Sequence, residues 1–331
     1  MQKGLKIPQG GPENRRFVLG IDIGGTGIKT GFVDTDGEVT RFRTLPTEGA
    51  RGREALLDKI CGIADAAAAA SAAEGFELLG IGIGTAGFVD SQGRIAYATE
   101  ILPGWTGTDL RGAVAERTGL DTAVLNDVHA IALGELWRGA GAKRGLRSFV
   151  CAALGTGIGG CIVEDGRIYG GRGGYAGGFG HMTVAQGGPV CSCGQRGCWE
   201  MYASVSALKR LIRERAEAAA AAAWERDPRL LFEAARAGDR DALGIVDHYA
   251  QMIAIGLVNL AHTLNCGDFV LGGAITRQGD FLLGRVEREM VRRLMPVYRA
   301  GGIGLHAAEL GERAGVIGAA YALLETPGAP Q

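Results

Sequence analysis

The chain has 331 residues and a mass of 34.4 kDa, with 47% apolar and 21% charged residues. This balance is typical of a globular protein of about two domains and excludes intrinsic disorder for the bulk of the chain. With 35 basic and 36 acidic residues the net charge is −1 at pH 7, so no overall basic field exists to bind nucleic acid or an anionic membrane. No uninterrupted apolar run approaches the ~18 residues of a membrane span.

Residues 1–16 carry proline and glycine where a secretory signal would carry an apolar segment, so we expect a flexible tail there. The seven cysteines are an odd number, which favours a reducing cytoplasm over a disulfide framework. The 57 glycines are far above the usual share, and we expect them in specific turns.

Strands and helices alternate along the first half of the chain. The patterns predict strands over 17–23, 27–33 and 38–43, a helix over 54–73, a strand over 78–84, a helix over 110–117, a strand over 122–125 and a helix that ends at Trp137. The first three strands form an antiparallel meander, because Asp34–Gly37 is a hairpin turn signal.

The pattern restarts in the second half. We predict strands over 148–154 and 158–163, a glycine- and cysteine-rich loop over 170–197, helices over 203–226, 229–237 and 241–264, a strand over 268–271, and helices over 281–295 and 314–324. Both halves open with strand, glycine-rich hairpin and strand, which indicates a duplicated α/β unit with a boundary near 125–139. A small-molecule site is expected where two such halves meet.

Two glycine-rich hairpins occupy matching positions of the two halves. The first contains Asp22, Gly24, Gly25, Thr26 and Lys29, and the second contains Gly155, Thr156 and Gly157. Glycine lets backbone N–H groups approach phosphate oxygens, and a preceding aspartate can hold Mg²⁺ through water. Each hairpin alone can be purely structural, but the pair predicts a clamp on a nucleoside triphosphate. Gly272 and Gly273 follow a later strand and are either a third element of that clamp or an ordinary turn.

Asn126 and Asp127 close a strand and open a helix. The simpler interpretation is a helix N-cap, which both residue types favour. The functional interpretation places the Asp127 carboxylate at the strand end, where it takes a proton from an attacking substrate hydroxyl.

A glycine-rich loop contains four potential metal ligands within a stretch of 18 residues: His181, Cys191, Cys193 and Cys198. One histidine and three cysteines complete the tetrahedral ligand set of a structural Zn²⁺ site. The alternative is a core histidine beside unlinked thiols. Glu200 lies two residues after Cys198, at the end of the predicted zinc loop, residues 178–200, and a bound zinc ion would fix its position.

These motifs together resemble the ROK family of sugar kinases and repressors over residues 17 to about 324. Gly180-His181 followed by Cys191-Ser192-Cys193-Gly194-Gln195-Arg196-Gly197-Cys198-Trp199-Glu200 is similar to the family signature. Asp22–Thr26, Leu154–Gly160 and Asn126-Asp127 are similar to its two phosphate loops and its catalytic pair, and Thr99–Arg111 is similar to its sugar-pocket segment.

The resemblance implies an α/β, two-lobed actin/hexokinase-like fold, of the duplicated ribonuclease H-like type, with a zinc knuckle. It implies an N-terminal lobe over 17–125 with a closing helix within 314–331, and a C-terminal lobe over 126–313. By position, Asp127 is the general base; Asn126, His181, Glu200, Gly87 and Thr99 contact sugar; Asp22 orients Mg²⁺; Lys29 and the glycines named above contact ATP. The implied partners are a sugar and ATP, and neither nucleic acid nor a membrane is expected as a partner. The resemblance also implies a cytoplasmic protein that forms a homodimer or homotetramer.

One departure from the family pattern concerns the substrate. Gly178 stands where the family has a glutamate that contacts sugar hydroxyls. We therefore expect a substrate other than plain glucose, either an N-acyl or amino sugar or a cyclitol; loss of activity is the alternative explanation. A lesser departure is Ala86, in place of a frequent proline, to which we assign no effect.

Two other classes of function remain as alternatives. A sugar-responsive repressor of this family carries a DNA-binding helix-turn-helix before the first strand, and here 16 residues precede Phe17. A non-catalytic sugar sensor would not need Asp22, Asp127 and both glycine hairpins.

Overall fold

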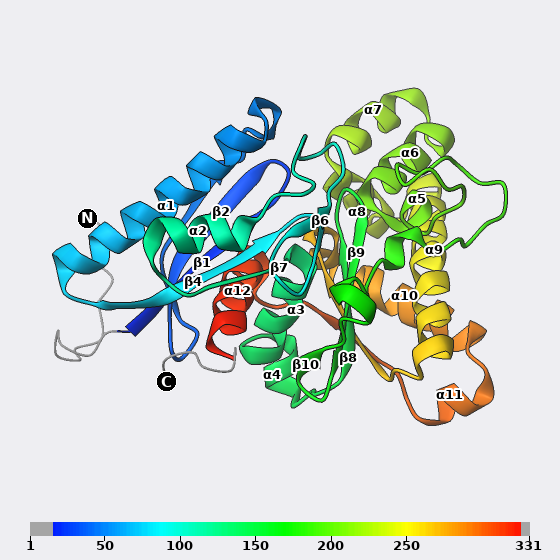
Figure 1. Ribbon diagram of the computed structural model, residues 1–331. Coiled ribbons are helices and arrows are strands. Elements are labelled where there is room, and N and C mark those ends of the chain that lie inside the picture. Colours follow the sequence, from blue (N-terminus) through cyan, green and yellow to red (C-terminus); the bar gives the residue numbers. More distant parts are fainter. Residues whose placement is uncertain (1–15, 326–331) are drawn as a thin grey trace, which may run out of the picture. The chain divides into compact units, whose positions relative to one another are not determined.

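The computed structural model describes residues 16–325, and these form two compact units, described separately below (Figure 1). The first contains the described residues up to Gly134 and from Gly315 onward, and the second runs from Glu135 to Ala314. The tail expected over residues 1–16 lies outside the described residues except for Arg16, which opens the first strand.

The first unit is built on a five-stranded sheet in the order β3-β2-β1-β4-β7. Its strands are β1 Arg16–Ile23, β2 Gly27–Asp34, β3 Val39–Pro46, β4 Glu77–Thr85 and β7 Thr122–Asn126, with a separate hairpin of β5 Phe88–Val89 and β6 Ile95–Tyr97. Strands β1 to β3 pair antiparallel as expected, and β1, β4 and β7 pair parallel.

Helices cover both faces of this sheet (Figure 1). They are η2 Gly49–Arg51, α1 Arg53–Glu74, α2 Leu110–Thr118, α3 Asp127–Trp137, whose last residues belong to the second unit, and α12 Ala314–Leu324. One face packs its apolar residues, such as Leu19 and Ile21, against Ile60 of α1. On the other face Gly82 has no space for a Cβ, because that atom would lie 1.9 Å from the Ala319 carbonyl oxygen of α12. The glycines of β4 therefore let α12 approach the sheet closely.

Helix α3 packs with the first unit, although the resemblance assigns residues from 126 onward to the C-terminal lobe. A Cβ on Gly318 of α12 would lie 1.7 Å from the Ala130 carbonyl oxygen, so the two helices are in backbone contact. The sequence offers no sign of this contact, since it joins residues from opposite ends of the chain.

The second unit repeats the sheet of the first. Its strand order is β10-β9-β8-β11-β12, with β8 Phe149–Leu154, β9 Ile158–Glu164, β10 Arg167–Ile168, β11 Asp268–Gly272 and β12 Gly304–Ala307. Again an antiparallel meander adjoins parallel pairs. The duplication predicted from the two glycine-rich hairpins is therefore present in the strand topology.

The helical part of the second unit consists of α4 Ala140–Arg144, η3 Arg172–Gly174, η4 Phe179–His181, α5 Glu200–Ala203, α6 Val205–Arg215, α7 Ala218–Arg226, α8 Pro228–Arg236, α9 Arg240–Leu264, η5 Ala274–Gln278, α10 Asp280–Arg293, α11 Pro296–Ala300 and η6 Gly311–Arg313. The single helix predicted over 203–226 is wrong. Ser204 is extended and caps α6 by accepting a hydrogen bond from the Ala207 N–H, and the extended Ala216 ends α6. An alanine-rich sequence contains no signal for these breaks.

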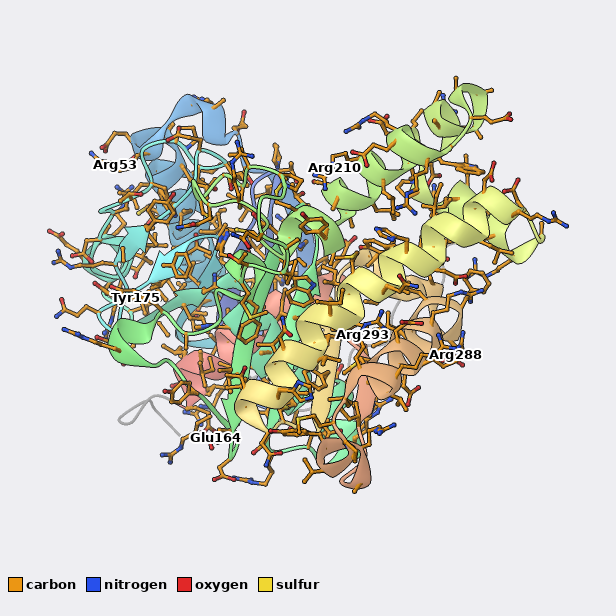
Figure 2. All side chains as sticks on the ribbon, turned by 90° about the vertical axis from the view of Figure 1, so that its right-hand side faces the viewer. Arg53, Glu164, Tyr175, Arg210, Arg288 and Arg293 are labelled. Atoms are coloured by element: carbon orange, nitrogen blue, oxygen red, sulfur yellow. The ribbon has the colours of Figure 1, made fainter. Side chains whose placement is uncertain are left out.

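Helix α9 is the core of the second unit, and Figure 2 shows it in yellow beside α10, on which Arg288 and Arg293 are labelled. Among the described residues, α9 is the one helix that is long enough and apolar enough to cross a membrane, judged by length and composition alone. However, 56% of its most apolar 18-residue segment is buried inside the protein. Ile245, Tyr249 and Ile253 pack in the core against the sheet residues Val150 and Leu271. This burial is characteristic of a core helix.

Candidate functional site

The carboxyl ends of three parallel strands bring polar residues of the first unit together. In the sheet register Asp22 of β1 lies opposite Gly84, and Asn126 of β7 lies opposite Thr85 of β4. Ligands of open α/β sheets bind at this end of the strands. Asp22 and Asn126 are far apart in sequence, but they lie on strands β1 and β7, on either side of β4, at the carboxyl ends of these strands.

Asn126 both caps helix α3 and holds Asp127. Its Oδ1 accepts the N–H groups of Val128 at 2.8 Å and His129 at 3.2 Å, while its Nδ2 donates to Asp127 Oδ1 at 2.8 Å. The same Nδ2 donates to the Gly87 carbonyl at 2.9 Å. The capping and functional interpretations of this pair are thus compatible, because one amide orients the carboxylate while it caps the helix.

Burial, together with the negative charge of Asp22, raises the pKa of Asp127 to about 7. Hydrogen bonds from the Val128 N–H and the Asn126 amide act in the opposite direction, since they favour the charged form. Asp127 keeps partial solvent access. A carboxylate with a pKa near neutrality and an accessible position has the properties of a general base.

Asp22 is buried, with 6% of its surface exposed, and its Oδ2 lies 3.2 Å from Lys29 Nζ. Burial raises its pKa and the Lys29 charge lowers it. The two residues face each other because they are paired across the β1–β2 hairpin. The lysine therefore partly neutralises a carboxylate that lies directly before the glycine loop.

The first glycine loop is a rigid hairpin. Gly24 N–H donates to the Gly27 carbonyl at 3.0 Å, and Thr47 Oγ1 donates to the Gly24 carbonyl at 2.6 Å. A Cβ on Gly25 would lie 2.3 Å from Ile101 Cγ2, so Ile101 packs directly on this glycine. Thr26 at the tip is exposed. The loop thus presents backbone at Gly24 and Thr26, while Ile101 covers Gly25; backbone N–H groups of such a hairpin are suited to phosphate oxygens.

The two further sugar contacts that the resemblance implies in this unit are placed differently. Gly87 has a φ of 109° and its carbonyl accepts a hydrogen bond from the Asn126 amide, so it lies beside Asn126 and Asp127. Thr99 lies in the loop after β6, where its carbonyl accepts from the Leu102 N–H at 3.0 Å. Within residues 16–325 no hydrogen bond joins Thr99 to Asn126 or Asp127.

The second glycine loop, in the second unit, is built like the first. Gly155 N–H donates to the Gly157 carbonyl at 3.0 Å, and the Gly155 carbonyl accepts from Val205 N–H at 2.8 Å. The exposed Thr156 lies between them. A Cβ on Gly155 would meet only the Gly157 carbonyl oxygen, at 4.0 Å, so folding alone does not demand glycine there.

Gly272 and Gly273 lie beside the start of this loop. Gly273 has a φ of 105°, and a Cβ on it would lie 2.2 Å from the Leu154 carbonyl oxygen. The backbone contact with Leu154 leaves no room for a side chain at this position, and it leaves both interpretations of the glycine open. Gly272 has open space at its Cβ position, with no atom closer than 3.8 Å.

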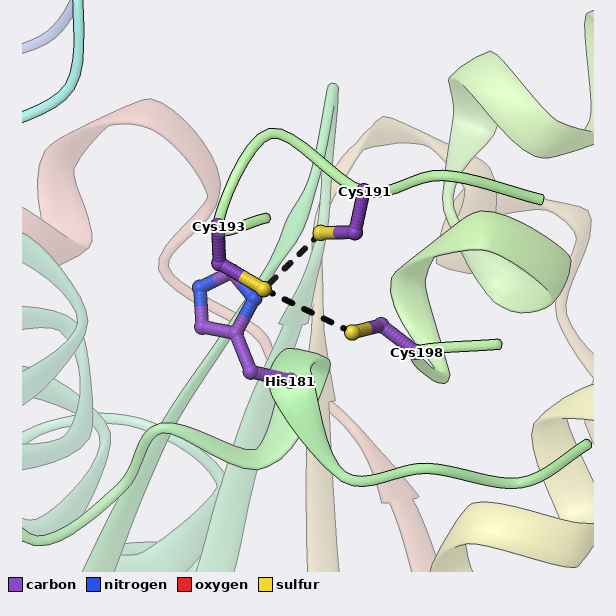
Figure 3. Close-up of side chains that lie close together, drawn as sticks. All are labelled: His181, Cys191, Cys193 and Cys198. Atoms are coloured by element: carbon purple, nitrogen blue, oxygen red, sulfur yellow. Dashed lines mark hydrogen bonds between the residues drawn. The ribbon is translucent and has the colours of Figure 1, made fainter. Parts of the chain in front are cut away.

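The four predicted metal ligands converge in the second unit, as Figure 3 shows. The ligand atoms of His181, Cys191, Cys193 and Cys198 all lie within 4.8 Å of one another. Cys191 Sγ is 3.6 Å from His181 Nδ1, and Cys193 Sγ is 3.6 Å from Cys198 Sγ.

This arrangement fits zinc. Ligand atoms about 2.3 Å from an ion at the centre of a tetrahedron are about 3.8 Å apart, close to the separations observed. Burial raises the pKa of the Cys191 thiol to about 12, and a bound divalent cation opposes that by stabilising the thiolate. With four protein ligands the site is closed, which is characteristic of structural zinc.

Glu200 links this cluster to the second glycine loop. Its Oε1 lies 3.0 Å from Cys191 Sγ and 3.8 Å from His181 Nδ1, and its Oε2 accepts the Ile158 N–H at 3.3 Å. A Cβ on Gly157 would lie 2.6 Å from Oε2. A side chain at position 157 would therefore displace the end of the Glu200 carboxylate from the loop. The sequence placed Glu200 next to the cluster but gave no sign of this second contact.

Sequence reasoning missed two buried polar groups. Glu135 is fully buried in the second unit, and its carboxylate accepts the N–H groups of Ala140 at 2.7 Å, Glu309 at 3.0 Å and Leu310 at 2.9 Å. In the first unit, Trp105 Nε1 donates to Thr85 Oγ1 at 3.1 Å at the end of β4. A glutamate in the apolar stretch of α3 was the available signal for Glu135.

Comparisons with known proteins agree with these features. The ROK family model matches residues 18–326. A glucokinase of Thermotoga maritima is 35% identical over 319 residues, covering 94% of this chain and 98% of the relative. A glucokinase of Halalkalibacterium halodurans is 36% identical over 316 residues, covering 92% and 94%.

The crystal structure of a Streptomyces griseus ROK glucokinase in complex with glucose and AMPPNP superposes with a TM-score of 0.75 at 33% identity, covering 92% of this chain and 98% of that one. This likeness confirms the expected hexokinase-like α/β fold. The family match over nearly the whole chain confirms the resemblance seen in the motifs: this chain is a member of the ROK family.

Proposed function

We propose that this chain is an ATP-dependent sugar kinase that transfers the γ-phosphate to a hydroxyl of a hexose or hexose derivative, with the 6-hydroxyl as the expected acceptor. The observation that carries the proposal is Asp127, a partly accessible carboxylate with a pKa of about 7 that Asn126 orients at the carboxyl end of β7. Relatives named glucokinase, at 35% and 36% identity, support the reaction class.

In the proposed reaction Asp127 accepts the proton of the attacking hydroxyl. The sugar oxygen forms the new bond to the γ-phosphorus, and the bond from that phosphorus to the bridging oxygen of ADP breaks. Asn126 keeps the carboxylate in place through its amide. Asn126, His181, Glu200, Gly87 and Thr99 are the proposed sugar contacts. Positioning and electrostatic stabilisation supply most of the rate in phosphoryl transfer.

The two glycine loops are the proposed phosphate contacts. Gly24, Gly25 and Thr26 present backbone in one, and Gly155, Thr156 and Gly157 in the other, with Lys29, Gly272 and Gly273 as further nucleotide contacts. Mg²⁺, which neutralises phosphate charge when bound, fits beside the buried Asp22 through water. His181, Cys191, Cys193 and Cys198 are the proposed zinc ligands, and zinc would hold the Glu200 segment in place.

The substrate is the finer part of the proposal. Gly178 stands where the family pattern has a glutamate, so an acceptor of hydroxyl hydrogen bonds is missing and space is available. A site that lacks such an acceptor loses preference for the sugar that needs it. We therefore propose an amino sugar, an N-acyl sugar or a cyclitol in preference to glucose, and a cytoplasmic homodimer or homotetramer.

The test is a coupled ADP-release assay with Mg-ATP across glucose, mannose, fructose, allose, N-acetylmannosamine, N-acetylglucosamine and a C7-cyclitol. The expected result is one preferred acceptor, with turnover lost in Asp127→Ala. Sugar binding without ATP turnover on any acceptor would favour the non-catalytic sensor. Binding to a DNA fragment from the chain's own promoter would favour the regulator.

A further inference from the structure

A cavity of about 350 Å³ lies in the first unit between α1 and strands β1 to β3. Its walls are mainly apolar, with Leu19 and Phe32 from the sheet, Leu45 from β3 and Ile63 and Ala67 from α1. None of the residues to which we assign a part in phosphoryl transfer lines it. The cavity is therefore a feature that the proposed function does not use.

The cavity exists because α1 presents small residues to it. Gly62, Ala66 and Ala70 lie along this side of the helix, and a Cβ on Gly62 would meet no atom within 4 Å. Glycine inside a helix costs about 1 kcal/mol relative to alanine. The chain thus keeps space at a position where alanine would fit and would favour the helix.

A hydroxyl group without a hydrogen-bond partner faces this space. Thr30 is 7% exposed and alternates along β2 with Ile28 and Phe32, both of which pack in the core with α1. Thr30 therefore points to the α1 side, where it lines the cavity. Its hydroxyl has no hydrogen bond to any residue within 16–325. Among the described residues Thr108 Oγ1 is the fully buried side-chain polar atom without a partner, so the Thr30 hydroxyl keeps contact with solvent and is accessible to a bound polar group.

Three cationic side chains surround the opening, and one of them has no ionic partner. Arg41 pairs with Glu74, and Lys59 pairs with Glu48. Arg43 lies opposite Thr30 in the strand register, so both belong to the same face of the sheet. Among the described residues Arg43 forms no ion pair. The opening therefore carries one uncompensated positive charge next to the unpartnered hydroxyl.

A β-bulge shapes this edge. The register shifts between Thr30 and Phe32, and Arg41 on the bulged strand has a φ of 53°. Bulges turn a side chain toward a new direction. The Arg41 guanidinium lies 5.7 Å from the centre of the Phe32 ring, over the apolar wall.

We propose that this cavity is a second binding site, for a small organic anion with an apolar body. The anionic group binds Arg43, with Arg41 and Lys59 nearby; a polar atom satisfies the Thr30 hydroxyl; and the apolar body packs against Leu19 and Ile63. The volume is at the lower end of small-molecule sites, about 300–1,000 Å³. The concave shape and surplus positive charge favour this occupant over a flat protein surface.

The test is a titration of the full chain with octanoate and octyl phosphate, and with octan-1-ol as the neutral control, all below their micelle concentrations. Binding is followed by calorimetry and by methyl NMR. We expect saturable binding of at least one anion, weaker binding of the alcohol, and shifts of the Ile63 and Leu45 methyl signals without shifts of Ile253 in the other unit.

Two variants address the site from different sides. Gly62→Leu fills the cavity and should lower the affinity for the anion at least tenfold. Arg43→Gln removes the unpaired charge and should lower the affinity about tenfold, as expected for the loss of a charge-assisted hydrogen bond. Ala72→Leu, on the exposed far side of α1, and Arg51→Gln, outside the cavity, are the matched controls and should bind like the unmodified chain.

The proposal is overturned if neither anion binds saturably, if octan-1-ol binds as tightly as octanoate, or if Gly62→Leu and Arg43→Gln leave binding unchanged. Circular dichroism establishes that each variant is folded. A change of sedimentation coefficient in Gly62→Leu, without an effect on anion binding, would instead make this face an interface between copies of the chain. Which anion binds distinguishes a carboxylate from a phosphate ester.

Discussion

Glu200 and Ile158 connect two segments that lie 42 residues apart, through a hydrogen bond of 3.3 Å from the Ile158 N–H to Glu200 Oε2. The other oxygen of the same carboxylate lies 3.0 Å from Cys191 Sγ. One side chain therefore joins the cysteine cluster to the second glycine loop. We therefore expect that a change in the conformation of the cysteine cluster alters the conformation of the second glycine loop.

Removal of zinc is expected to lower thermal stability and to loosen the second glycine loop. The purified chain should contain about one zinc per chain by elemental analysis, because the cluster supplies a complete ligand set. Chelation should lower the melting temperature and increase amide exchange at Ile158. Cys193→Ser should mimic chelation, while Cys266→Ser, outside the cluster, should not. A chain free of zinc with unchanged stability would refute the metal assignment.

Gly157→Ala is expected to displace the Glu200 carboxylate from the Ile158 N–H, because the new Cβ would lie 2.6 Å from Glu200 Oε2. We expect a lower melting temperature and at least a tenfold loss of kcat/KM for ATP. Gly155→Ala has room for its Cβ and should fold normally, so an increased KM for ATP there would show that a phosphate needs the space. Gly244→Ala on α9, with no atom within 4 Å, is the control. Normal ATP kinetics in Gly155→Ala would contradict the phosphate-loop assignment.

The rate of phosphoryl transfer should rise with pH through about 7, since Asp127 is the base only when deprotonated and its pKa is about 7. Asp127→Asn should lose about 10²–10⁴ in kcat, the usual contribution of a general base. The measurement is kcat/KM between pH 5.5 and 9. A flat profile in this range would argue against Asp127 as the titrating base.

The same pKa predicts the opposite trend for stability. The folded-state pKa of Asp127 is raised above its ordinary value of 3.8, so the folded state binds the proton more tightly. The Asp127 contribution to stability is therefore lost as pH rises from about 4 to about 7. Asp127→Asn should melt at a higher temperature than the unmodified chain at pH 8, and the two should converge near pH 4. A lower melting temperature of Asp127→Asn at pH 8 would contradict this.

Glu135→Ala is expected to destabilise the second unit by about 2–4 kcal/mol, because three backbone N–H groups lose a buried acceptor. Glu135→Gln keeps one acceptor oxygen and should cost less. Denaturant unfolding gives the free energies, and Glu164→Ala, an exposed glutamate of the same unit, is the control. Equal stability of all three variants would show that the hydrogen bonds from Glu309 and Leu310 to Glu135 do not stabilise the second unit.

Gly178→Glu is expected to shift substrate preference toward glucose. The φ of Gly178 is −68°, which any residue can adopt, so the backbone permits the substitution. The glutamate would restore an acceptor for sugar hydroxyls, and a tenfold or larger change in the ratio of kcat/KM values is expected. The substrate panel is measured again with this variant and with Gln186→Glu, at an exposed position of the same loop, as the control. An unchanged ratio would remove the basis for a non-glucose substrate.

Local patterns allowed most of the elements to be predicted. Strands β1 and β2 follow from short β-branched runs around Gly24 and Gly25, and the hairpin signal at Asp34–Gly37 fixed the turn. The metal cluster followed from spacing alone, since Cys191, Cys193 and Cys198 lie within one short loop. The helix predicted over 203–226 is interrupted because the extended Ala216 ends α6 before α7 begins, and the alanine-rich sequence around it has no glycine or proline to signal the break.

The sequence by itself determined the duplicated strand–hairpin–strand units, the placement of the glycine loops and the cysteine cluster, because each depends on residues close together in the chain. Tertiary structure alone decided the rest. The pKa of Asp127 depends on burial and on the charge of Asp22 from another strand. The dual contact of Glu200, the buried acceptor Glu135 and the cavity beside Gly62 depend on which segments pack together. Electrostatic and packing energies act through space, so a pattern read along the chain does not contain them.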